Sequence, residues 1–198
     1  QNDDPLKQVR RQDVAVLFID IIGFTRLAAD QDALKVIELL RGFHGRMERE
    51  VFRHHGTLDK YLGDGLMATF GTPVAGERDA SHALECARDM VTTINKWNVE
   101  RSRAGEPEIK IAVGLHYGTA VLSDIGANRL EFAVIGTTVN VAARLEKLTR
   151  DLGVAIAVSD ELRTQVMLEN NLDLSTQSRF ENQEIRGISG AVTVWGEG

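Results

Sequence analysis

Two apolar runs on either side of a Gly-Asp-Gly turn give the strongest constraint on the fold of this chain. Leu58–Leu62 and Leu66–Phe70 have the length of strands, and the intervening Gly63–Gly65 is typical of a turn that closes a β-hairpin. An earlier run, Val14–Ile19, is almost wholly apolar and ends at Asp20, as expected of a strand buried on both faces. We therefore expect a sheet that contains one buried strand and a hairpin.

Two longer segments have the period of amphipathic helices. From Asp32 to about His54, apolar residues recur every three or four positions, and Asp30 or Asp32 can cap the first turn. A second stripe of the same kind extends over residues 79–103. Both helices are expected to pack one apolar face on the sheet.

The second half of the chain alternates strands and helices in shorter pieces. Strands are expected at 109–117, 119–124, 130–135 and 155–158. One helix is expected after the candidate cap Thr137 or Thr138, and another after Ser159 or Asp160. A closing hairpin is expected at about 178–195. Adjacent strands with helices between them predict an α+β sandwich, in which helices cover one face of a largely antiparallel sheet.

Composition narrows the class of protein and its partners. A chain of 198 residues with 43% hydrophobic residues fits one domain with a sizeable core. The net charge of -6, without a basic run, argues against nucleic acid or a membrane surface as partner. No apolar stretch reaches the ~18 residues of a membrane span. Cys86 is expected to be a buried apolar residue. Because it is the single cysteine, disulfides within the chain are excluded, and a reducing, cytosolic setting is favoured.

Two acidic side chains stand where the backbone changes direction, Asp20 at a strand end and Asp64 at the hairpin tip. If the strand lies beside the hairpin, both carboxylates point to one spot. Close carboxylates repel each other unless a cation neutralises them, and hard oxygen ligands select Mg²⁺ or Mn²⁺. The glycine turn in Ile21–Thr25 adds backbone N–H groups that can face phosphate oxygens. Taken singly, each Asp is more simply explained as part of a plain turn.

A second pair of polar residues, Asn140 and Arg144, lies four residues apart on a predicted helix. This spacing puts both side chains on one face, where they reach the same ligand. The guanidinium suits the charge that builds on a pentavalent phosphorus, and the amide can bind a ribose oxygen. The alternative is that Arg144 pairs with an acidic neighbour, Glu146 or Glu131.

Three segments, in this order, resemble the motifs of class III nucleotide cyclases, most closely the bacterial adenylate cyclases. Phe18–Thr25 resembles the family's first metal-binding strand and phosphate loop, and Lys60–Ala68 resembles its metal-binding hairpin. Val134–Arg144 resembles its transition-state segment. The resemblance covers about 13–195 and implies the nucleotide cyclase fold, a ferredoxin-like or palm-type βααβαβ sandwich.

The resemblance implies an adenylate cyclase that forms cyclic AMP and pyrophosphate from ATP with two Mg²⁺ or Mn²⁺ ions per site. It assigns metal binding to Asp20, Ile21 and Asp64, catalysis to Asn140 and Arg144, and substrate binding to Lys60, Gly23, Phe24, Thr25, Ala133 and Ile135. In this family the metal-binding pair and the Lys/Asn/Arg set come from opposite subunits. A homodimer with two equivalent sites is therefore implied.

Two departures from the family pattern bear on the substrate. Lys60 stands where guanylate cyclases place Glu, which favours adenine, but Ala133 replaces the Asp or Thr that usually accepts from the adenine amino group. We therefore expect weaker selectivity for ATP over GTP. The closing hairpin offers a single cation for the triphosphate in its turn, Arg186.

The resemblance also implies a context for the domain. Residues 1–12 are expected to be a linker from an upstream regulatory region, with a sensor, and 13–198 the catalytic domain, in the cytoplasm or on the cytoplasmic face of a membrane if the full-length protein is anchored. A catalytically silent cyclase-homology domain and a guanylate cyclase are the alternatives. The Gly-Gly-Asp/Glu-Glu-Phe signature of a diguanylate cyclase is absent.

Overall fold

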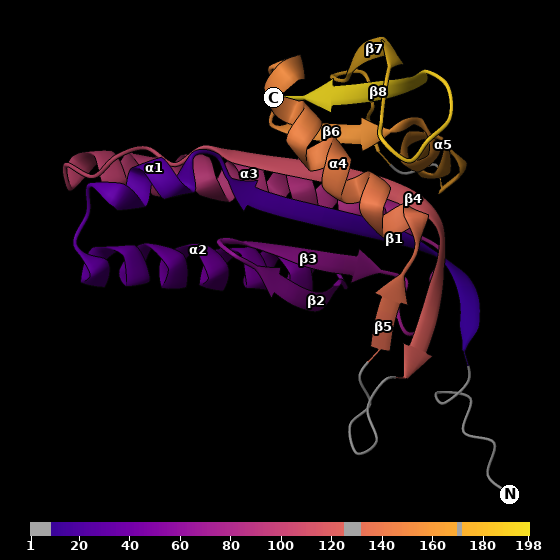
Figure 1. The fold of residues 1–198 in the computed structure, drawn as a ribbon, viewed down its shortest axis with the longest axis horizontal. Helices are drawn as coiled ribbons and strands as arrows, with labels where there is room; N and C mark the ends of the chain where they lie inside the picture. The colour runs from indigo at the N-terminus through magenta and orange to yellow at the C-terminus, as the bar shows by residue number, and fades with distance from the viewer. Residues whose placement is uncertain (1–8, 125–131, 170–171) are drawn as a thin grey trace, which may run out of the picture.

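The computed structural model describes residues 9–124, 132–169 and 172–198 (Figure 1). Its helices and strands, in chain order, are β1 (Arg10–Ile21), α1 (Phe24–Ala29), α2 (Ala33–Arg53), β2 (Thr57–Leu62), β3 (Gly65–Phe70), α3 (Asp79–Arg103), β4 (Ile111–Asp124), β5 (Phe132–Ile135), α4 (Thr137–Leu152), β6 (Ile156–Ser159), α5 (Asp160–Glu169), β7 (Ser178–Gln183) and β8 (Val192–Glu197).

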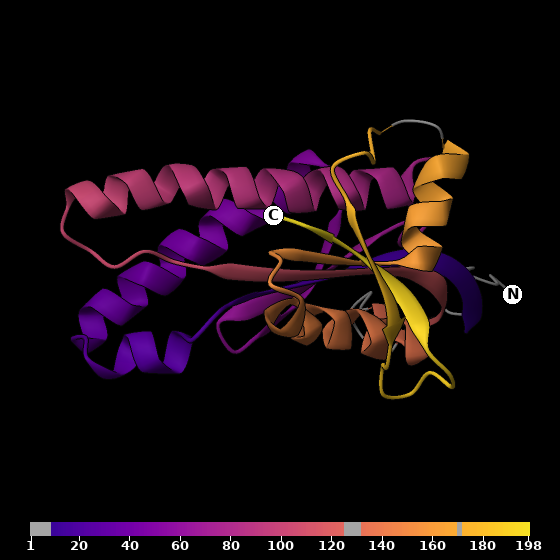
Figure 2. The same cartoon turned by 90° about the horizontal axis from the view of Figure 1, so that it is seen from above.

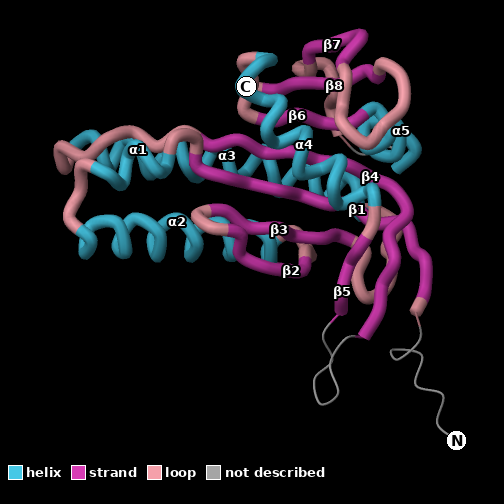
Figure 3. The backbone as a smooth tube through the Cα atoms, in the orientation of Figure 1, coloured by secondary structure: helices cyan, strands magenta, loops and turns pink. Residues whose placement is uncertain are grey.

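One sheet runs through the described part of the chain, in the order β2-β3-β1-β4-β6-β8-β7, with β5 paired to β4. The β4–β6 pair is parallel and the other pairs are antiparallel, which confirms the expected α+β fold with a largely antiparallel sheet. Figure 3 shows the β4–β5 pair extending away from the main body. Strand β1 lies between β3 and β4, so both neighbours hold its backbone.

Helices cover both faces of the central strands, which differs from the expected single covered face (Figure 2). Ala15, Leu17 and Ile19 of β1 share a core with α2, α3 and α5, whereas Val14 and Val16 share a second one with Ala142 of α4. Alternate residues of a strand point to opposite faces. The continuous apolar run of β1 therefore serves two layers.

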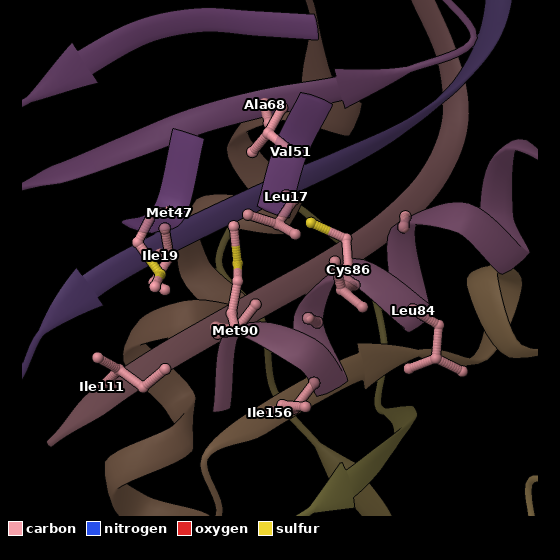
Figure 4. Packing of buried hydrophobic residues seen from close by; sticks show 14 of the residues in the cluster. Leu17, Ile19, Met47, Val51, Ala68, Leu84, Cys86, Met90, Ile111 and Ile156 are labelled. Carbon is pink, nitrogen blue, oxygen red and sulfur yellow. The ribbon is translucent and has the colours of Figure 1, made fainter. Parts of the chain in front are cut away.

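The larger core lies between β1, β3 and the helices α2 and α3 (Figure 4). The predicted stripe of α2 supplies Phe43, Met47 and Val51, each fully buried. A fully buried side chain of this size contributes about 1.5 to 3 kcal/mol relative to exposure. Cys86 of α3 is buried in the same core, as predicted, and burial raises the pKa of its thiol well above the ordinary range.

Two element predictions were wrong in detail. Strand β4 is continuous where two strands were expected, because Gly118 is not a break: a Cβ there would lie 2.8 Å from Oγ1 of Thr138, so the glycine lets α4 approach the strand. Helix α1 begins inside the segment expected to be only a glycine turn, with Gly23 at φ 68° as its N-cap. Six residues are too few to show a helical period.

The caps were predicted with mixed success. Helix α4 begins after Gly136, and Thr138 donates instead to the backbone carbonyl of Thr119 (2.6 Å), so neither threonine caps it. Asp32 occupies the N-cap position of α2 without a side-chain capping hydrogen bond. Ser159 does cap α5, since its Oγ accepts from the Leu162 N–H at 3.1 Å. Among the described helices, none combines the length and the apolar character needed to cross a bilayer.

Candidate active site

Asp20 and Asp64 lie together at one end of the central strands. The antiparallel register that pairs Ile19 of β1 with Leu66 of β3 carries the hairpin tip to the end of β1. The backbone N–H of Ile21 is 3.0 Å from Oδ1 of Asp20 and 3.0 Å from Oδ2 of Asp64. The predicted convergence of the two carboxylates is thus present in the fold, with Ile21 buried between them.

A second glycine of the hairpin turn allows this close approach. A Cβ on Gly65 would overlap the backbone carbonyl of Ile19 and lie 3.1 Å from Oδ1 of Asp20. Gly63, in contrast, has φ 61° and open space around its Cβ position, so it serves the turn itself. Sequence analysis interpreted both glycines as turn residues and missed the packing role of Gly65.

The carboxylate pair is electrostatically unfavourable without a cation. Burial, the hydrogen bond to Asp64 and repulsion from Asp64 and Glu146 raise the pKa of Asp20 to about 7. Among the residues that the structure describes, neither carboxylate forms an ion pair with a Lys, Arg or His. Oxygen ligands that share a buried negative charge fit a hard divalent cation such as Mg²⁺ or Mn²⁺.

A cavity of about 280 Å³ opens beside Asp20, between β1, the β2–β3 hairpin and one face of α4. Glu146 of α4 lines it and is only 4% exposed; its Oε2 accepts from Arg150 at 3.1 Å, while its Oε1 has no described hydrogen-bond partner. Burial raises the pKa of Glu146. The expected alternative, a surface pair between Glu146 and Arg144, is wrong, because Glu146 is buried and pairs with Arg150. The other candidate partner, Glu131, lies outside the described residues.

Asn140 and Arg144 lie on α4, as predicted, and neither lines the cavity beside Asp20. Asn140 is exposed and Arg144 is partly buried. The Arg144 Nη1 donates to the backbone carbonyl of Arg186, in the connection between β7 and β8. Within one chain, the Asn/Arg pair therefore lies outside the cavity that Asp20 lines.

The remaining predicted site residues lie on β2, at the start of α1 and on β5. Lys60 is exposed on β2, with its Nζ 3.6 Å from Oδ2 of Asp59. Gly23 and the first α1 residues, Phe24 and Thr25, follow directly after β1; Phe24 packs against the core and Thr25 is exposed.

The two predicted site residues of β5 are placed by their strand. Ile135 is 58% exposed and pairs with Val121 of β4, and Ala133 pairs with Ser123. The side chain of Ala133 lies outside the described part of the structure.

A second acidic cluster, Glu50, His54 and Asp89, lies between α2 and α3 and was missed by sequence analysis. His54 is buried, and its Nε2 is 2.8 Å from Oδ2 of Asp89. Arg53 donates to both carboxylates, at 2.5 Å to Glu50 and 3.1 Å to Asp89. Because a protein cation already neutralises this cluster, it is a weaker metal-site candidate than the unpaired Asp20 and Asp64.

A family model and the curated relatives identify the same family. Residues 6–196 match the model of the adenylate and guanylate cyclase catalytic domain. Adenylate cyclase 1 of Rhizobium meliloti is 34% identical over 78% of this chain and 24% of its own length, and the adenylate cyclase of Anabaena cylindrica is 29% identical over 92% of this chain and 36% of its own length. The chain thus spans about a quarter to a third of these relatives.

Solved structures have the same fold. The adenylyl cyclase CyaB of P. aeruginosa superposes with a TM-score of 0.81 at 25% identity, covering 96% of this chain and 95% of that one. The guanylyl cyclase Cya2 superposes with a TM-score of 0.83 at 24% identity, covering 94% of this chain and 92% of that one. Structural similarity therefore extends to cyclases of either nucleotide.

Proposed function

The chain belongs to the adenylate and guanylate cyclase catalytic-domain family, and we propose that it converts ATP to 3′,5′-cyclic AMP and pyrophosphate. The ribose 3′-oxygen forms a bond to the α-phosphorus, the bond from that phosphorus to the bridging oxygen breaks, and pyrophosphate leaves with the electron pair. The proton of the 3′-hydroxyl passes to solvent, so no dedicated protein base is required. The observation that carries this proposal is the convergence of Asp20 and Asp64 in a chain that also has Asn140 and Arg144 on α4.

Asp20, Ile21 and Asp64 are the residues we assign to two divalent ions, Mg²⁺ or Mn²⁺. When bound, such ions neutralise the triphosphate and lower the pKa of the attacking hydroxyl. The chain's part is to hold two carboxylate oxygens close together, and the shared Ile21 N–H fixes their orientation. The unpaired charge of the two carboxylates supports this assignment.

Asn140 and Arg144 are the residues we assign to the reacting part of the nucleotide. An amide side chain can orient the ribose by hydrogen bonding, and a guanidinium stabilises the charge on the α-phosphoryl oxygens. Both side chains are hydrogen-bond donors on one face of α4, so they can act on the same nucleotide. Their contribution to catalysis is positioning and charge stabilisation.

Asn140 and Arg144 lie outside the cavity that Asp20 lines, and Arg144 contacts the β7–β8 connection instead, which supports a site shared between two copies. In a symmetric homodimer, the Asp20 and Asp64 surface of one protomer faces the Asn140 and Arg144 surface of its partner, and two equivalent sites form. A monomer should be almost inactive, because each half-site lacks the other's groups.

We propose ATP as the substrate because Lys60 carries an ammonium group that can donate to the N1 acceptor of adenine. Lys60 is exposed on β2, where its side chain can reach a ligand outside its own chain. The adenylate cyclases among the relatives favour the same choice. GTP is the second candidate, because Ala133 offers no side-chain acceptor to the adenine amino group and a guanylyl cyclase shares the fold.

One experiment tests both the reaction and the shared site. The purified domain is incubated with ATP or GTP and Mn²⁺, and cyclic nucleotide is measured for wild type, Asp20→Ala, Arg144→Ala and an equimolar mixture of the two variants. We expect cyclic AMP from wild type, almost none from either variant, and partial recovery in the mixture, since one complete site forms per heterodimer. A wild type inert towards both nucleotides would favour the catalytically silent alternative, and a mixture as inactive as its parents would exclude the shared site.

A further inference from the structure

The connection between β7 and β8 makes a direct contact with the side chain that we assign to transition-state stabilisation. Arg144 donates through Nη1 to the backbone carbonyl of Arg186. Among the described residues, Arg144 forms no ion pair, so this carbonyl is the group that holds the guanidinium. The resemblance to the family suggested a role for the side-chain charge of Arg186, whereas in the structure its backbone carbonyl accepts the hydrogen bond from Arg144.

The same connection is anchored on the helix that carries Arg144. Ile185 is 7% exposed and packs, together with Ile188, against Val141 and Leu145 of α4. The Ile188 N–H donates to the carbonyl of Ile185 at 3.0 Å, which closes a tight turn around Arg186. The carbonyl that accepts from Arg144 is therefore fixed relative to α4 by apolar contacts on either side of it.

Gly187 occupies the position where a side chain would displace the end of the Arg144 side chain. A Cβ on Gly187 would overlap Nη1 of Arg144, and the residue has φ 94°. Gly190, three residues later, has φ 82° but nothing within 4 Å of its Cβ position. The connection thus contains two glycines with the same kind of backbone, of which only one touches the guanidinium.

We propose that the β7–β8 connection positions Arg144 for catalysis through the Arg186 carbonyl, and that Gly187 is a positioning residue because a side chain at this position would push the guanidinium away from that carbonyl. The inference rests on the proposed function. A guanidinium is planar with five N–H donors, so one anchored Nη1 fixes the plane and directs the remaining donors. A small misplacement of such a group lowers turnover without changing what binds the ground state.

The first test compares Gly187→Ala with Gly190→Ala in the purified full chain. Both substitutions put Ala at positive φ, so backbone strain is common to them. We expect kcat of Gly187→Ala to fall by about 10- to 100-fold with KM for Mn-ATP unchanged, and kcat of Gly190→Ala to stay within about twofold of wild type. Equal effects of the two variants, or a rise in KM alone for Gly187→Ala, would overturn the proposal.

A double-mutant cycle isolates the path through Arg144. In an Arg144→Ala background, Gly187→Ala should lower the residual rate by less than about twofold, since the side chain it displaces is already absent. If Gly187→Ala lowers that residual rate by the same factor as in wild type, the connection acts on something other than Arg144 and the proposal is wrong.

A readout without turnover separates this inference from the proposed function. The ¹⁵N NMR signals of the Arg144 guanidinium should report slowed rotation of the Nη groups in wild type and in Gly190→Ala, and free rotation in Gly187→Ala. Freely rotating Nη groups in wild type would overturn the inference even if Gly187→Ala fails to fold. A domain that forms no cyclic nucleotide but retains the slowed rotation would contradict the function and leave the positioning contact supported.

Discussion

The two halves of the proposed site are built on different principles. The Asp20 and Asp64 half lies on β1 and the β2–β3 hairpin, where the strands on either side of β1 fix the backbone and Gly65 is pressed against Ile19. The other half lies on α4, whose first turn lacks a side-chain cap, and its arginine is held by a connection between strands. The first half holds two carboxylates of like charge close together. The second half depends on the direction in which the Asn140 and Arg144 N–H groups point.

This difference predicts which properties, ion affinity or kcat, should change when each half is mutated. Substitutions in the carboxylate half should change the affinity for divalent ions together with turnover, because the two oxygens are the proposed ligands. Substitutions in the α4 half should change kcat and leave ion binding alone.

The largest effect is expected from neutralising one carboxylate. Asp64→Asn should lower turnover by about 10³-fold or more and weaken Mn²⁺ binding, because an amide supplies no negative charge to the ion. Mn²⁺ binding is measured by electron paramagnetic resonance. Asp151→Asn is the control, since Asp151 is an exposed carboxylate on α4. Unchanged Mn²⁺ binding in Asp64→Asn would remove the basis of the metal assignment.

A loss of turnover without a loss of ion binding is expected in the other half. Asn140→Ala and Arg144→Ala should each lower kcat by about 10²- to 10³-fold, the usual effect of removing one donor to a developing charge. Mn²⁺ affinity, measured in the same way, should equal that of wild type. A parallel fall in Mn²⁺ affinity would mean that α4 shapes the carboxylate half, and the contrast between the two halves would fail.

The glycines of the hairpin turn give a smaller effect that is local to the carboxylate half. Gly65→Ala should destabilise the fold by about 1 to 3 kcal/mol, because its Cβ meets the Ile19 backbone and Asp20 Oδ1 and the hairpin must shift. Gly63→Ala, with open space at its Cβ, should lose only the strain of positive φ, about 1 kcal/mol. Urea unfolding measures both variants. A larger loss for Gly63→Ala would contradict the packing role of Gly65.

Features that depend on local pattern were predictable from the sequence. The stripe in 79–103 gave α3 with the bounds that the structure has, and the Gly-Asp-Gly turn gave the β2–β3 hairpin with Asp64 at its tip. The fold class followed from the order of these elements. Roles that the family resemblance implied for Lys60 and Ala133 are still predictions.

Features that depend on a distant neighbour were not predictable. Gly65 and Gly187 look like ordinary turn glycines until Asp20 and Arg144 are seen against them. The sequence around Glu146 does not indicate that this α4 residue is buried near the carboxylates of Asp20 and Asp64. The placement of α4 on the opposite face escaped prediction because β1 is apolar on both faces, which identifies burial but not the covering helix.

The smallest effect is a pH-dependent change in stability, and its sign follows from the charge confined in the carboxylate half. The pKa of Asp20 is about 7 in the fold against an ordinary value of 3.8, so between these values the native state retains a proton that the unfolded chain releases. This carboxyl therefore destabilises the ion-free fold increasingly as pH rises from about 4 to 7, and fully above 7.

Asp20→Asn removes that penalty and should be more stable than wild type at pH 8 by about 1 to 2 kcal/mol, since solvent screens a half-buried carboxyl. At pH 4 the two proteins should have the same stability, because Asp20 is then protonated in the fold. Urea unfolding in a chelator at both pH values measures the difference, and saturating Mn²⁺ at pH 8 should stabilise wild type much more than the variant. A difference between the two proteins that does not change with pH would mean that the carboxylates are not confined together, and the contrast between the charged half and the α4 half would lose its physical cause.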